Sequence, residues 1–145
     1  MTALASTLAE LVAALNDGVA FYERAAQKSG DPSLADLFAR MARLKRSLAD
    51  EINTVIAQEG APTQDGGSMF GALRMLYADV LAKLSDENAG TYVARLEEEE
   101  DRLRATFREA VLGGDSATVR ELALRLYPEI DAMHAEMSRL KKALA

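Results

Sequence analysis

Residues 28–32, Lys28-Ser29-Gly30-Asp31-Pro32, decide the fold, because one amphipathic segment ends there and another begins. Before this stretch, apolar residues recur every three, four or seven positions, at Leu4, Leu8, Leu11, Leu15 and Tyr22. That spacing predicts a helix from Thr2 or Thr7 to Lys28. Ser29-Gly30 ends it. An aspartate cap followed by a proline, whose missing N–H costs nothing at the first helical position, then starts a second helix that we expect to reach Glu59.

Residues 113–115, Gly113-Gly114-Asp115, divide the C-terminal half in the same way. They separate a predicted helix of about residues 87–112 from a last helix of about residues 116–144. Short loops make consecutive helices antiparallel neighbours, so the chain contains two predicted helical hairpins. The residues between the hairpins, roughly 60–86, are too many for a turn and carry a helical apolar pattern from Ser68 onward. We therefore expect an all-α fold: a single domain, 1–145, built as a ferritin-like four-helix bundle whose two hairpins are joined by a long, partly helical crossover.

Composition agrees with a folded helical domain. The 145 residues are 49% hydrophobic and 28% charged, with only 3 Pro and 9 Gly, which is typical of globular proteins. The absence of cysteine excludes disulfides, thiolate metal sites and a cysteine nucleophile. No basic residue precedes Arg24, and no uncharged apolar run approaches the ~18 residues of a membrane span. A soluble, cytoplasmic protein is expected.

The charge balance argues against two classes of partner. A net charge of −6 disfavours nucleic acid, whose phosphates need a basic face. Basic residues gather at Arg40, Arg43, Lys45 and Arg46, but they are interleaved with apolar residues, so we interpret them as a solvated face. Membrane-surface binding by residues 68–84 is disfavoured because that segment has little positive charge.

Candidate functional residues lie in the second hairpin. Glu100 occupies a core position in the series Val93, Leu96, Glu100, Leu103 and Phe107, where a carboxylate must be protonated, paired or bound to a cation. His134 is the only histidine and follows Asp131 by three residues. Two residues at this spacing point the same way from a helix, as two ligands of one metal would. Pro128 predicts a local bend one turn earlier.

This pattern resembles known helical bundles. Glu100, followed by Asp131-Ala132-Met133-His134, is similar to the second half of a bacterioferritin or rubrerythrin, with Asp where those proteins usually have Glu. The whole chain resembles more closely a bacterial ferritin-like four-helix-bundle family known only as a domain of unknown function. The residues that carry this resemblance are Leu15-Asn16-Asp17-Gly18 followed by Tyr22, Asp31-Pro32, Leu37-Phe38, Asp50-Glu51, Glu59-Gly60-Ala61-Pro62 and Phe70-Gly71-Ala72-Leu73.

The first hairpin departs from the di-iron pattern that the resemblance implies. The hairpins resemble each other, and in their common register Leu15 stands where Glu100 stands in the second and Ala49 stands where His134 does. Most metal ligands of the di-iron families therefore have no counterpart. A ferroxidase centre that cycles two irons is not expected.

Two interpretations of Glu100, Asp131 and His134 remain open. In the first, they form a structural polar cluster that fixes helix register in a non-catalytic bundle with a degenerate di-iron site, which assembles as a homo-oligomer, most simply a dimer, with a structural, interaction or stress-related role. In the second, they bind a single divalent ion, iron, manganese or zinc, in a protein of the iron-handling or oxidative-stress class. The sequence favours the first and assigns no catalytic residue.

Overall fold

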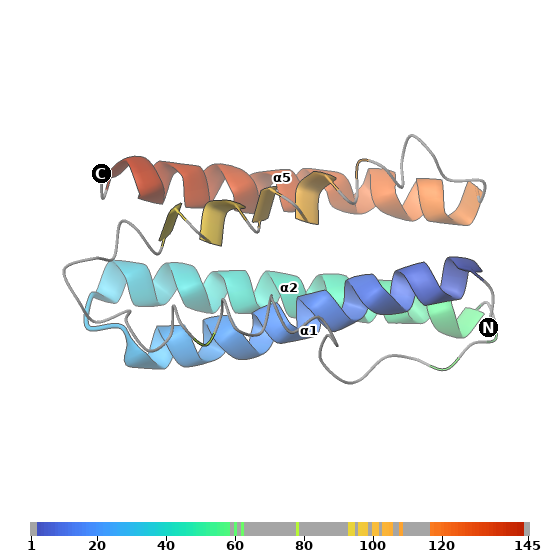
Figure 1. Ribbon diagram of the computed structural model, residues 1–145, viewed down its shortest axis with the longest axis horizontal. Coiled ribbons are helices and arrows are strands. Elements are labelled where there is room, and N and C mark those ends of the chain that lie inside the picture. Colours follow the sequence, from blue (N-terminus) through green and yellow to red (C-terminus); the bar gives the residue numbers. More distant parts are fainter. Residues whose placement is uncertain are drawn as a thin grey trace. The chain divides into compact units, whose positions relative to one another are not determined.

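The protein is all-helical. The computed structural model describes residues 3–58, 60, 62, 78, 93, 94, 96–98, 100, 101, 103–105, 108 and 117–143, and none of these lies in a strand. The chain forms two compact units, Met1–Ser85 and Asp86–Ala145. The first contains α1 (Ala3–Lys28) and α2 (Pro32–Gln58), and the second contains α5 (Ala117–Ala143). Every described residue between 93 and 108 is also helical (Figure 1). The predicted all-α fold class is confirmed for the described residues.

The turn at residues 29–31 forms as predicted. The Ser29 amide still donates to the Ala25 carbonyl at 2.9 Å, which completes the last turn of α1. Asp31 then caps α2, because its Oδ1 accepts from the Ser33 amide at 2.9 Å and from the Leu34 amide at 3.4 Å. These amides lack partners within the helix, so the cap supplies what the backbone cannot. At the other end of α2, Gly60 takes a positive φ of 79° and closes the helix, as glycine commonly does at this position.

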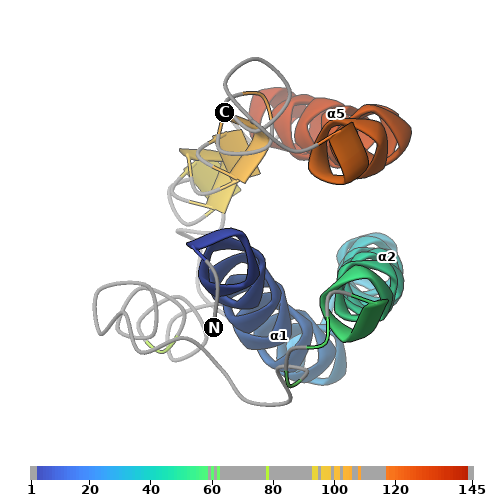
Figure 2. The same cartoon turned by 90° about the vertical axis from the view of Figure 1, so that its right-hand side faces the viewer.

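The core of the first hairpin follows the predicted apolar positions. Helices α1 and α2 lie side by side, as the views of Figure 1 and Figure 2 both show. The large buried side chains of the hairpin include four from the predicted series of α1, Leu8, Leu11, Leu15 and Tyr22, and Leu37, Met41, Leu48, Ile52 and Val55 from α2. An aromatic cluster lies among them: the Tyr22 ring is 4.9 Å from Phe21 and 5.7 Å from Phe38 between centroids. Such a cluster fixes how the two helices meet, because aromatic pairs have preferred geometries.

Lys45 corrects one prediction. We expected it on a solvated basic face with Arg40, Arg43 and Arg46, which are indeed exposed. Lys45 is only 2% exposed. Its Nζ lies 5.7 Å from the centroid of the Tyr22 ring, within the range of a cation–π contact. The apolar stem of lysine packs as a hydrophobic side chain does, so a position beside the core stripe accommodates it.

In the second unit, α5 lies beside the helical residues between 93 and 108, drawn in yellow in Figure 1. The large buried side chains of α5 are spaced three or four apart along one face: Leu122, Leu126, Ile130, Met133 and Met137. Val93, Leu96 and Glu100 are buried on the other segment. Helix α5 continues through Pro128, and the local bend predicted there stays a prediction.

Some predicted features lie outside the described residues. These are the crossover helix from Ser68, the turn at residues 113–115, and Phe107 of the predicted core series. The ferritin-like connectivity and the single-domain organisation therefore stay predictions. Within the described part of the chain, no helix combines the length and the hydrophobicity that crossing a bilayer requires.

Candidate functional site

Polar side-chain contacts join the segment of residues 93–108 to α5 in an antiparallel register. Glu97 Oε2 lies 3.2 Å from Lys141 Nζ, and Asp101 Oδ1 lies 3.2 Å from His134 Nε2. Moving forward along one segment thus means moving backward along α5. The second predicted hairpin is confirmed as an antiparallel pair of helical segments, and its polar contacts run along the seam between them.

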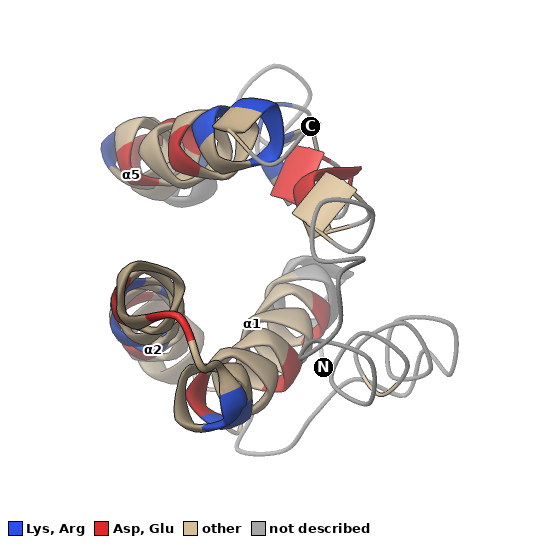
Figure 3. Cartoon of the chain, turned by 90° about the vertical axis from the view of Figure 1, so that its left-hand side faces the viewer, with Lys and Arg blue, Asp and Glu red and all other residues tan. Residues whose placement is uncertain are grey.

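At the centre of this seam lies a group that we call the Arg104 cluster: Asp101, Arg104, Tyr127, Asp131 and His134. The Arg104 guanidinium approaches α5 at two points, since its Nη1 lies 3.1 Å from His134 Nδ1 and its Nε lies 3.5 Å from Asp131 Oδ1. Asp101 and Arg104 are three residues apart, as are Asp131 and His134, so each pair shares one face of its helix. Figure 3 shows how acidic residues gather on the described part of residues 93–108, while α5 carries both signs of charge. Arg104 is the cation at the middle of the cluster.

The contacts of His134 define which of its nitrogens carries the proton. An arginine guanidinium is always a donor and never an acceptor. His134 Nδ1, facing Arg104 Nη1, must therefore accept, so it carries no hydrogen. The hydrogen of the neutral ring then lies on Nε2, which faces the Asp101 carboxylate. Both ring nitrogens are satisfied in this tautomer, and the one lone pair that a neutral imidazole offers to a metal is engaged by Arg104.

The environment of Arg104 favours its protonated, positively charged form. A side-chain hydrogen bond with Tyr127 raises the pKa of the Arg104 guanidinium above its ordinary value, and the negative charges of Asp131 and Asp101 raise it further, against the opposing effect of burial. A base whose pKa rises on folding contributes stability below its unfolded pKa, which for arginine lies beyond the physiological range. Arg104 is therefore a permanent cation in this site, and its contribution does not vary with pH near neutrality.

The three residues predicted from sequence occupy different environments. Glu100 is buried, 2% exposed, as its core register predicted, and it takes part in a polar or electrostatic contact. Asp131 is exposed along 56% of its side chain and faces Arg104. His134 is partly buried between Arg104 and Asp101. Across the described residues, no three histidine, aspartate or glutamate side chains gather closely enough to hold a metal ion.

Sequence reasoning missed three members of the cluster: Tyr127 on α5, and Asp101 and Arg104 on the other helical segment. The sequence signal that identifies Asp101 and Arg104 is their spacing. Arg104 follows the core position Glu100 by one helical turn, and Asp101 precedes Arg104 by three residues. An arginine at such a position, on a segment that packs against the helix carrying the only histidine, is a candidate partner for that histidine.

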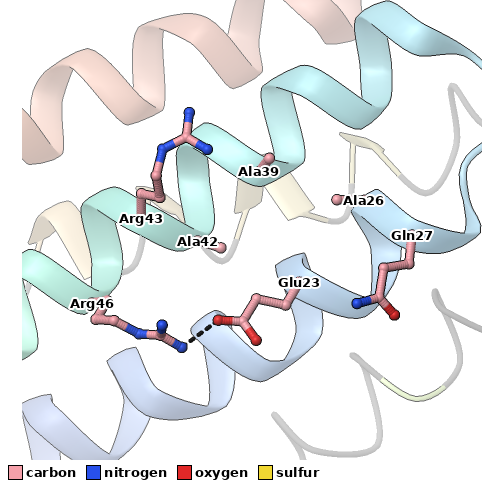
Figure 4. Close-up of a pocket in the computed structure, with 7 residues that line it drawn as sticks. All are labelled: Glu23, Ala26, Gln27, Ala39, Ala42, Arg43 and Arg46. Carbon is pink, nitrogen blue, oxygen red and sulfur yellow. Dashed lines mark hydrogen bonds and ion pairs between the residues drawn. The ribbon is translucent and has the colours of Figure 1, made fainter.

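The first hairpin carries a second polar feature, a groove of about 320 Å³ between α1 and α2. Its floor is formed by alanines, and Glu23, Gln27, Arg43 and Arg46 stand at its rim (Figure 4). Arg46 forms an ion pair with Glu23, whereas the Arg43 guanidinium points away from that pair. The Glu23 carboxylate is neutralised by Arg46, and the side chains at the rim do not converge on a common point. The groove therefore has the character of a helix–helix seam, not of an active site.

Fold and site together define a helical protein with antiparallel hairpins, the second held by charged and hydrogen-bonded side chains. Residues 3–112 match the family described as a domain of unknown function (DUF2383). The chain therefore belongs to this family. The match ends before α5, so it covers Glu100 and Arg104 but not Asp131 or His134. No curated protein and no solved structure matches the chain.

Proposed function

We propose that this protein is a non-catalytic helical bundle, with a structural, interaction or stress-related role, in which the Arg104 cluster fixes the register of the second hairpin. One observation carries the proposal: Arg104 engages His134 Nδ1 at 3.1 Å. A metal ion at His134 would have to displace that contact and then lie beside a permanent positive charge. Like charges at contact distance oppose each other strongly where water is partly excluded.

The completeness of the hydrogen bonding supports a structural role. Among the described residues, no buried side-chain nitrogen or oxygen lacks a partner. Catalytic and ligand sites often retain such unsatisfied groups, because a substrate or an ion completes them. Asp101 and Asp131 instead find a donor or a cation across the seam. A network of this kind specifies one register out of several that the apolar positions alone would allow.

The proposal includes a ferritin-like arrangement of the two hairpins with a degenerate di-iron site. Its support is the order of the elements, with one antiparallel hairpin, a connection of roughly residues 60–86, and a second antiparallel pair. Leu15, where the first hairpin would supply a carboxylate, is fully buried as an apolar side chain. Self-association, most simply as a homodimer, and residence in the cytoplasm belong to the same proposal and rest on the sequence.

A second candidate function is retained because of Glu100. A carboxylate that is 2% exposed in a helical core is unusual, and buried carboxylates frequently serve metals. In this alternative Glu100, Asp131 and His134 bind one divalent ion, iron, manganese or zinc. Arg104 would then swing away from His134, which the flexible arginine side chain permits. The alternative therefore predicts a metal-dependent loss of the Arg104–His134 contact.

Metal analysis separates the two functions. The protein, without an affinity tag, is purified in the absence of chelators beside a His134→Ala variant, and iron, manganese and zinc are measured in both. Equal and negligible metal in the two preparations supports the non-catalytic bundle and eliminates the alternative. Near-stoichiometric metal in the wild type, lost in the variant, would instead overturn the proposal. Glu129→Ala, at an exposed position on the same helix, is the control for effects of substitution in α5.

A further inference from the structure

Exposed apolar residues lie in a line along the outer face of α5, beside the exposed charges of Arg125 and Asp131. Leu124 is 60% exposed, and it is the one large hydrophobic side chain with that exposure among the described residues. Pro128, Ala132 and Ala135 are exposed as well. Their spacing of four, four and three residues places them in line with Leu124, away from the buried positions of the helix. We call these four residues the α5 outer face.

The charges at the two ends of this face are opposite. Glu121 stands one turn before Leu124, and Arg139 stands one turn after Ala135; both are exposed. The two residues are 18 positions apart, about 27 Å along a helix, so they cannot pair within one chain. An antiparallel copy of the same face, however, would place each of them beside its opposite charge.

We propose that the α5 outer face binds a second copy of this chain, with the two α5 helices antiparallel about a twofold axis near Ile130. In this arrangement Glu121 of each copy meets Arg139 of the other. Leu124 projects toward Ala132 and Ala135 of the other copy, whose small side chains leave room for it. The inference rests on the self-association included in the proposed function and assigns it to a surface.

The charge pattern selects a second copy, and the antiparallel orientation, over other occupants. A twofold contact brings one patch against itself, so it is favourable only when the patch complements itself. Glu121 and Arg139, equidistant from Ile130, meet that condition. A parallel pairing would put glutamate on glutamate and arginine on arginine, and like charges directly opposed disfavour association.

Charge reversal provides a direct test. The association of the full chain is measured by sedimentation or light scattering over a range of micromolar concentrations, for the wild type, Glu121→Arg, Arg139→Glu and the double variant. Each single reversal creates two like-charge contacts in the dimer, and we expect its dissociation constant to rise on the order of tenfold. The double variant restores opposite charges, so we expect its dissociation constant to lie within about threefold of the wild-type value.

Two further variants control for folding. Leu124→Glu removes the projecting side chain and Ala132→Arg fills the space opposite it; both lie at exposed positions, so circular dichroism should show unchanged helix while the dimer is lost. A wild-type protein that stays monomeric at these concentrations would overturn the inference and the self-association together. A dimer that none of the four substitutions weakens would overturn the inference alone and place the contact on another surface. A double reversal that fails to rescue the single ones would also contradict it.

Discussion

Arg104 Nη1 lies 3.1 Å from His134 Nδ1, and this one contact joins the two helical segments of the second hairpin at their most polar point. Because arginine only donates, the contact defines the tautomer of the histidine and engages its lone pair. The contact between Arg104 and His134 therefore supports a structural role for the second hairpin.

Removing the histidine should destabilise the protein. His134→Ala removes one contact of Arg104 and one of Asp101 in a partly buried seam, so we expect a loss of about 1–3 kcal/mol in the free energy of unfolding, measured by urea denaturation. His134→Asn retains an acceptor close to the position of Nδ1 and should lose less than the alanine variant. Glu129→Ala, exposed on α5 and outside both the Arg104 cluster and the proposed contact surface, should stay within about 0.5 kcal/mol of the wild type. A His134→Ala protein as stable as that control would contradict the structural role.

The Arg104–His134 contact should be measurable as a coupling energy. In a double-mutant cycle of Arg104→Ala and His134→Ala, the two effects should not add, with an interaction energy of about 0.5–3 kcal/mol. Arg104→Ala alone should cost more than His134→Ala, because it also deprives Tyr127 and Asp131 of their partner. Additive effects would show that the two side chains do not depend on each other.

Two glycines should respond oppositely to alanine. Gly60 has a φ of 79°, which a residue with a Cβ adopts only with strain, so Gly60→Ala should destabilise by about 1 kcal/mol. A Cβ added at Gly30 meets nothing within 4 Å, and its φ is not in the left-handed region. Gly30→Ala should therefore be neutral or stabilise by up to about 1 kcal/mol, through the unfolded chain. Thermal denaturation of the two variants side by side tests the pair, and equal effects would contradict the assigned backbone conformations.

Lys45 should be protected from acylating reagents in the folded protein. Its 2% exposure contrasts with that of Lys28, Lys141 and Lys142, which are exposed. Mass spectrometry after brief labelling should find Lys45 modified much more slowly than these three. In urea all four should react alike. Labelling of Lys45 at the rate of Lys28 in the folded state would show that it is not buried.

Much of the fold follows from local chemistry that a sequence displays. Asp31-Pro32 and Gly60 set helix ends through capping and backbone geometry, and the structure has both ends within one residue of the prediction. Apolar spacing predicted the core positions, including the burial of Glu100. Lys45 escaped the same reasoning because a long side chain beside an apolar stripe can either extend to water or lie along the core, and periodicity does not distinguish the two.

The candidate site was predicted less completely. His134 and Asp131 stood out because a lone histidine near a carboxylate suggests a metal ligand. Their partner is Arg104, a residue on another helical segment, and which residues face each other across a hairpin depends on its register. The pairing of Asp101 with His134 and of Glu97 with Lys141 reveals that register. The sequence thus identified Asp131 and His134 on α5, and the structure added Arg104 and Asp101 from the other helical segment.

The most direct test of the account is the nitrogen NMR spectrum of the His134 ring. Since His134 is the only histidine, the tag-free protein labelled with ¹⁵N-histidine gives one pair of ring signals without assignment. At neutral pH we expect the tautomer with hydrogen on Nε2 and none on Nδ1, unchanged when an equimolar amount of zinc or manganese is added. A hydrogen on Nδ1, or ring signals that shift or broaden in proportion to the added metal, would contradict the claim that Arg104 holds this histidine as a structural element.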